Sequence, residues 1–139
     1  MKNQVTSIGQ SKRLIELGVP AQKASMAWIP GYEFDALTRR FIPNDKECFL
    51  SISYNRSSLM GDNIVAAFTV ADIMELLPMF IERKGTFYLN ITPCYEGWYA
   101  GYETEKGSEL ASYRGPKLVD VLMAATEWLL SNGYELNLQ

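Results

Sequence analysis

The sequence predicts an α+β domain in which a small, mainly antiparallel sheet is packed by a long C-terminal helix and shorter helices. Residues 116–132 carry apolar side chains at helical spacing, residues 86–104 hold two alternating segments joined by a turn, and capping motifs open two earlier helices. The 139 residues, 47% hydrophobic and 21% charged, suit a single globular domain spanning residues 1–139.

The first predicted helix follows a capping box. Ser7 can accept a hydrogen bond from the backbone of Gln10, whose side chain can return one to Ser7. The helix runs to about Leu17 and ends at Gly18. We expect a second short helix over Ala21–Ala27.

The middle of the chain gives weaker signals. Trp28–Tyr32 contains Pro-Gly and predicts a turn that carries large side chains, and Pro43–Asp45 is a second turn signal. Ala36–Ile42 fits a helix or a strand. Cys48–Tyr54 alternates and predicts a strand, and the polar Asn55–Asn63 predicts a loop.

The next segment predicts a short strand followed by a helix. Ile64–Phe68 is a short apolar run of strand length. Thr69–Asp72 resembles a helix N-cap, with the Asp72 carboxylate near the positive end of the helix dipole. The helix should run to Leu77 because Pro78 follows.

An antiparallel hairpin is predicted next. Thr86–Thr92 alternates apolar and polar residues, Pro93–Glu96 forms a connection, and Gly97–Thr104 forms the second strand. Residues 106–108 turn again, and the segment to Arg114 leads into the long helix.

The long C-terminal helix should begin near Pro116, which suits a first helical turn, and end at Gly133. Its apolar stripe predicts burial against the sheet. The stripe is formed by Leu118, Leu122, Ala125 and Leu129, with Val119, Met123 and Leu130 beside it.

Charge and composition exclude several partner classes. The 13 basic and 16 acidic residues give a net charge of -3, so no basic excess indicates nucleic acid or an anionic membrane. The N-terminus has no apolar run long enough for a signal peptide, and no stretch approaches the roughly 20 apolar residues that span a membrane. Cys48 and Cys94 are far apart in sequence and are expected as free thiols in the cytoplasm.

The sequence names no catalytic residue, metal site or cofactor. It contains no histidine, which removes the commonest general base and metal ligand. Two separated cysteines do not form a zinc site. Glu103 and Glu105 would share a strand face, which we interpret as a solvated surface.

The candidate binding residues come from the aromatic segment and its surroundings. Alternation predicts Trp98 and Tyr102 on the face that packs against the long helix. The opposite face would expose Tyr99, which with Tyr88 and Tyr113 would form a shallow recognition or dimer surface. Arg114 could help an anion bind at the N-terminus of the long helix.

Three stretches resemble a group of small uncharacterised bacterial proteins that often occur in phage-derived or mobile elements. They are Gln10–Pro20, Thr69–Pro78, and Leu118–Tyr134 with its Leu-Val-Asp, Glu-Trp-Leu and Asn-Gly-Tyr motifs. The resemblance implies a bacterial cytoplasmic or phage-associated accessory protein. It implies no activity, cofactor or catalytic residue.

Three functions follow as hypotheses. The first is a non-enzymatic interaction protein that binds a protein partner or forms a homodimer. The second is a small-molecule or peptide-binding domain with a pocket near Trp98 and Tyr102. The third and weakest is an enzyme that uses carboxylate, tyrosine or cysteine chemistry. A pocket with converging polar groups would favour the second or third, and an exposed apolar patch would favour the first.

Overall fold

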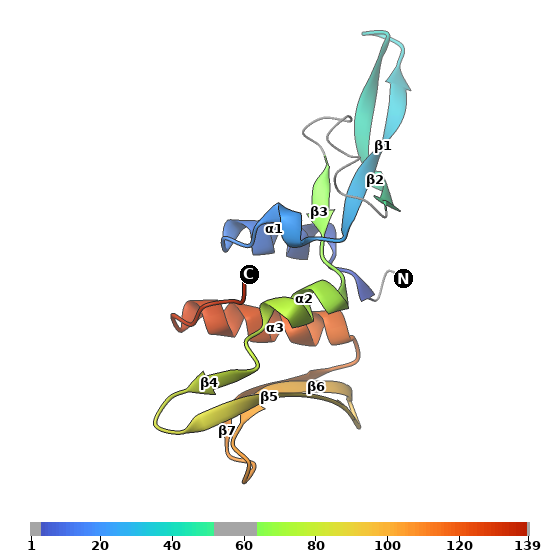
Figure 1. Ribbon diagram of the computed structural model, residues 1–139. Coiled ribbons are helices and arrows are strands. Elements are labelled where there is room, and N and C mark those ends of the chain that lie inside the picture. The colour runs from blue at the N-terminus through green and yellow to red at the C-terminus, as the bar shows by residue number, and fades with distance from the viewer. Residues whose placement is uncertain (1–3, 52–63, 139) are drawn as a thin grey trace. The chain divides into compact units, whose positions relative to one another are not determined.

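The computed structural model (Figure 1) confirms the α+β class, with helices and antiparallel sheets. It describes residues 4–51 and 64–138, with the backbone alone for Pro30 and residues 43–48. The chain divides into two compact units. We call Ser7–Phe68 the N-terminal unit, and Thr69–Gln139 together with Met1–Thr6 the C-terminal unit. The expectation of a single domain stays a prediction.

The C-terminal unit contains a four-stranded antiparallel sheet in the order β4-β5-β6-β7. The predicted hairpin is confirmed, with a tighter connection than expected: Cys94 pairs with Gly97, so only Tyr95 and Glu96 form the turn. Two strands of this sheet were not predicted. The segment expected to lead into the long helix is a strand, and a short edge strand precedes the hairpin. The strands are β4 (Phe80–Glu82), β5 (Thr86–Cys94), β6 (Gly97–Glu103) and β7 (Glu109–Gly115).

The long helix is confirmed as α3 (Leu118–Ser131), which packs on β6 and β7 along one face of the sheet (Figure 1). Leu122 and Leu129 are fully buried, as the stripe predicts. Pro116 lies before the helix and not in its first turn, because Lys117 is the N-cap.

Gly133 ends α3 with a φ of 79°. The backbone N–H of Tyr134 donates to Leu129 O at 3.0 Å and that of Gly133 to Leu130 O at 3.3 Å. This is the pair of bonds of a Schellman motif, which satisfies carbonyls that the helix leaves unpaired.

The helix predicted after Thr69 is α2 (Val70–Leu76). Thr69 and Asp72 form the full capping box, in which each side chain accepts from the other residue's backbone N–H. The α2 helix contacts α3, and the following Pro78 carbonyl accepts a hydrogen bond of 2.7 Å from the hydroxyl of Tyr102. That bond ties the segment after α2 to the C-terminal end of β6.

The N-terminal unit opens with α1 (Ile8–Glu16), whose predicted capping box is present. Gly18 ends it at a φ of 98°, again with Schellman bonds, here from Gly18 and Val19 to Ile15 and Leu14. The predicted helix over Ala21–Ala27 is wrong beyond Lys23. A single 3-10 turn covers Ala21–Lys23, and strand structure begins at Met26.

The second sheet has the order β2-β1-β3. Its strands are β1 (Met26–Asp35), β2 (Arg40–Ser51) and β3 (Val65–Ala67). The turn predicted at Trp28–Tyr32 is wrong, since these residues lie inside β1. The turn predicted at Pro43–Asp45 is also wrong, since the chain reverses at residues 36–39. This reversal resolves the ambiguity of Ala36–Ile42 as a turn followed by a strand.

The expected strand Cys48–Tyr54 is confirmed as far as Ser51, and its remainder and the predicted loop Asn55–Asn63 lie outside the described residues. The single predicted sheet is wrong here, because residues 48–51 pair with β1 in a separate sheet and not with the β5–β6 hairpin. The predicted strand Ile64–Phe68 is confirmed as β3, which pairs with Met26–Trp28 at the base of β1.

Candidate functional site

The predicted aromatic residues divide between the two faces of the C-terminal sheet. Trp98 and Tyr102 share the face that α3 covers, as expected, and Tyr102 is only 1% exposed. Tyr113 pairs directly with Ala100, so it lies on this same face and not beside Tyr99. Burial raises the pKa of both Tyr102 and Tyr113 above that of a free phenol. The predicted surface of Tyr88, Tyr99 and Tyr113 is therefore wrong, because Tyr113 lies on the other face of the sheet.

Tyr99 lies on the outer face, as the alternation predicts, but its expected exposure is wrong. It is 5% exposed because neighbouring side chains of its own sheet enclose the ring. The guanidinium carbon of Arg114 lies 5.1 Å from the centre of that ring. The hydroxyl reaches along the sheet over Gly101, where a Cβ atom would come within 2.6 Å of it. Tyr88, which shares this face, is 44% exposed and keeps a role in binding as a prediction.

A polar network surrounds the Tyr99 hydroxyl. The hydroxyl contacts Glu103 Oε2 at 2.9 Å and Glu109 Oε1 at 3.2 Å. Asn90 donates to Glu103 at 2.9 Å, and Ser112 donates to Glu109 at 3.0 Å. The expectation that Glu103 simply faces solvent is wrong, because it accepts bonds from two strands. Glu105, expected on the same face, lies in the turn after β6.

The network holds Tyr99 as a neutral phenol. Burial, followed by the hydrogen bond and negative charge of Glu103, raises the pKa of Tyr99 above its ordinary value of 10.0. A neutral phenol bonded to two carboxyl groups is poorly suited to act as a nucleophile or base. The arrangement joins β5, β6 and β7 by side-chain bonds and gives the outer face a structural role.

Arg114 does not serve the helix N-terminus, contrary to the expected anion site. Its side chain lies on the outer face over Tyr99, and its guanidinium is 3.8 Å from Glu109 Oε1. The reason is that β7 continues to Gly115, which fixes Arg114 opposite Tyr99 in the ladder. The cation beside the start of α3 is Lys117.

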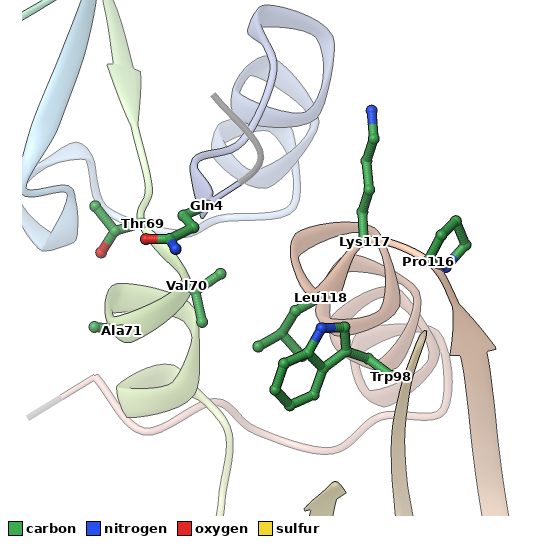
Figure 2. Close-up of a pocket in the computed structure, with 8 residues that line it drawn as sticks. All are labelled: Gln4, Thr69, Val70, Ala71, Trp98, Pro116, Lys117 and Leu118. Carbon is green, nitrogen blue, oxygen red and sulfur yellow. The ribbon is translucent and has the colours of Figure 1, made fainter. Parts of the chain in front are cut away.

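A cavity of about 610 Å³ lies on the α3 side of Trp98. Figure 2 shows the indole of Trp98 beside Leu118, with Val70 across the opening and the Lys117 side chain extended away from the indole. The volume lies in the range of small-molecule sites. Its walls are formed by Gln4, Thr69, Val70, Ala71, Trp98, Pro116, Lys117 and Leu118.

The far end of the β1–β2 hairpin is the strongest surface feature that the sequence pattern did not reveal. Phe34 is 57% exposed and Phe41 is 70% exposed, and their ring centres are 5.4 Å apart across the two strands. Tyr32, two residues before Phe34 in β1, shares their face and is 39% exposed. We call Tyr32, Phe34, Leu37 and Phe41 the hairpin patch.

Leu37 stands at the tip of the hairpin patch and is 96% exposed. The turn that presents it is ordered by Asp35, whose carboxylate accepts from the backbone N–H of Leu37 at 3.1 Å and the hydroxyl of Thr38 at 2.8 Å. Arg39 closes the turn with a φ of 55° and an N–H bond of 2.8 Å to Asp35 O. The sequence signal was this Asp-x-x-Thr turn between alternating aromatics, which the Pro-Gly pair at residues 30–31 obscured.

No family model, curated protein or solved structure matches this chain. The resemblance to bacterial and phage-associated proteins therefore stays a prediction. Among the described residues, no cluster of three or more His, Cys, Asp or Glu side chains could hold a metal ion. Cys94 is a free thiol. Within the same part of the chain, no helix is both long and apolar enough to span a bilayer.

Proposed function

We propose that this protein is a non-enzymatic interaction protein that binds another protein chain through the hairpin patch. The observation that carries the proposal is Leu37, displayed at 96% exposure by an ordered turn beside the Phe34–Phe41 pair. Clustered exposed apolar side chains of this size typically mark protein contacts. Because the turn is already ordered, binding costs less conformational entropy.

The charges at the hairpin end support a protein partner over nucleic acid or lipid. Glu33 and Asp35 are balanced by Arg39 and Arg40 at the same end of the hairpin. Nucleic acids and anionic membranes are recognised by a local basic excess, which this segment lacks. We further propose that the protein is a cytoplasmic accessory protein of bacterial or phage origin, because its sequence resembles the group of small bacterial proteins described above.

A photo-crosslinking amino acid at position 37 tests this function in the cells that encode the protein. We expect specific adducts with one protein chain, identified by mass spectrometry. The purified partner should then bind wild type at least tenfold more tightly than Leu37→Asp. The matched control places the crosslinker at position 80, because Phe80 is 56% exposed in the other unit. Adducts no stronger at position 37 than at position 80 would contradict the proposal.

A second candidate function, small-molecule binding, is favoured by the cavity beside Trp98. Its walls are largely apolar, and Lys117 supplies a cation at the rim. An anionic aromatic dye, 8-anilinonaphthalene-1-sulfonate, is a suitable probe. We expect saturable binding that Trp98→Ala and Lys117→Glu each weaken at least fivefold, while Leu37→Asp leaves it unchanged. Binding that ignores the two cavity substitutions would exclude this function.

A further inference from the structure

We infer that the chain bound by the hairpin patch is a second copy of this protein, an inference that rests on the proposed function. Tyr32, Phe34 and Phe41 of the patch lie on one face of a two-stranded ribbon, because Phe34 and Phe41 are direct partners and Tyr32 shares their face. Leu37 stands in the turn at the end of this ribbon. The described strand β3 reaches only Met26–Trp28 of β1, well short of this end. An isolated two-stranded ribbon is marginally stable in water, so a covering layer would stabilise it.

The area of the patch suits a weak symmetric dimer. From exposed fractions of 39%, 57%, 96% and 70% for its four residues, and about 200 Å² for a large side chain, each patch offers roughly 500 Å². Two copies would bury roughly 1,000 Å², the lower bound for a specific interface. We expect a dissociation constant on the order of 10 µM, as for weak, transient contacts.

The geometry favours stacking of the two faces over pairing of strand edges. The partner of Pro30 in β2 is Cys48, whereas that of the adjacent Gly31 is Asn44, so residues 45–47 form a bulge in β2. A bulge of this kind interrupts the edge of β2 and disfavours edge-to-edge pairing along that strand. Two patches related by a two-fold axis place identical aromatic groups against each other, which forms a minimal two-layer core.

Local charge also suits a second copy. The hairpin end carries Glu33 and Asp35 with Arg39 and Arg40, so its formal charge sums to zero. Two identical surfaces of strong single-sign charge would repel each other, and this end avoids that cost. Asp35 is already engaged by the turn, with Thr38 and Leu37 as its donors.

Sedimentation velocity of the full chain from about 1 to 300 µM tests the inference. The weight-average mass of wild type should rise from 15.7 kDa toward twice that value. Leu37→Asp and the double variant Phe34→Ser/Phe41→Ser should stay monomeric. The matched control Phe80→Ser should dimerise like wild type, because Phe80 has nearly the same exposure as Phe34 but lies in the other unit. The exposed position of Leu37 makes Leu37→Asp compatible with folding, which circular dichroism checks.

A wild-type monomer over the whole range would overturn the second-copy inference, as would a dimer that survives both hairpin variants. The proposed function fails separately. If wild type is monomeric but crosslinking at position 37 captures a different protein whose binding Leu37→Asp weakens, the interaction function holds and only the identity of the partner is wrong. If position 37 gives no specific adduct as well, both proposals fail.

Discussion

The two antiparallel sheets of this protein differ in what covers them. In the C-terminal unit, α3 packs on β6 and β7 along one face of the sheet, and bonds among Tyr99, Glu103 and Glu109 cover part of the outer face. In the N-terminal unit, the far end of the β1–β2 hairpin leaves Phe34 and Leu37 exposed. A sheet packed by a helix supplies stability, whereas an open ribbon supplies a surface for another chain.

The largest effect that separates these regions should come from two leucines. Leu122→Ala should lower the free energy of unfolding by about 2–5 kcal/mol, because Leu122 is a fully buried residue of α3 and its truncation leaves a cavity. Leu37→Ala should change it by less than about 0.5 kcal/mol, since Leu37 is exposed. Urea denaturation of monomeric protein measures both. Equal losses of unfolding free energy in the two variants would contradict the difference in burial between the covered sheet and the open hairpin.

Two glycines extend the comparison. At Gly101 an added Cβ would lie 2.7 Å from the backbone carbonyl oxygen of Ala111 and 2.6 Å from the Tyr99 hydroxyl. Gly101→Ala should therefore cost about 1–3 kcal/mol through overpacking. Gly9 in α1 has its nearest neighbour at 4.0 Å, so Gly9→Ala should stabilise by about 0.5–1 kcal/mol. Thermal unfolding shows whether each variant is more or less stable than wild type. If Gly101→Ala does not lower the stability, the outer face is loosely packed.

The Tyr99 network makes the C-terminal unit sensitive to alkali. Because the pKa of Tyr99 is raised in the folded state, its stabilising contribution is complete below the unfolded value of 10.0 and is lost as pH rises above it. Tyr99→Phe should cost about 1.5–3 kcal/mol at pH 7, as expected for a hydrogen bond to a charged group. It should also flatten the alkaline decline in stability. Urea titrations from pH 7 to 11 measure both, and unchanged stability at pH 7 would show that the network contributes little.

The smallest expected effect concerns the turn of the open hairpin. The hydrogen bond from Thr38, followed by that from the Leu37 N–H, lowers the pKa of Asp35 below 3.8. The Asp35 carboxylate therefore stabilises the turn above pH 3.8, and this stabilisation is lost as the pH falls through the lowered pKa of the folded state. Amide chemical shifts of Leu37 should report this titration by NMR. In Asp35→Asn the shift change should disappear, and a persistent change would assign the titration to another group.

Elements whose signals are carried by a few adjacent residues could be predicted from the sequence alone. Capping boxes at Ser7 and Thr69 fixed the starts of two helices, and Gly18 and Gly133 fixed the ends of two. The hairpin around Gly97 and the buried stripe of the long helix were also predictable. These features depend on backbone conformation and hydrophobic period, which neighbouring residues set among themselves.

Tertiary structure decided which strands share a sheet and which faces are open. The Pro-Gly pair in β1 indicated a turn, yet the Asx turn at Asp35 and pairing with β2 placed it within a strand. Tyr99 was rightly assigned to the outer face, but Glu109 and Arg114, which enclose it, lie on a strand that was not predicted. Alternation specifies on which side a residue points, whereas burial depends on what distant segments place against that side.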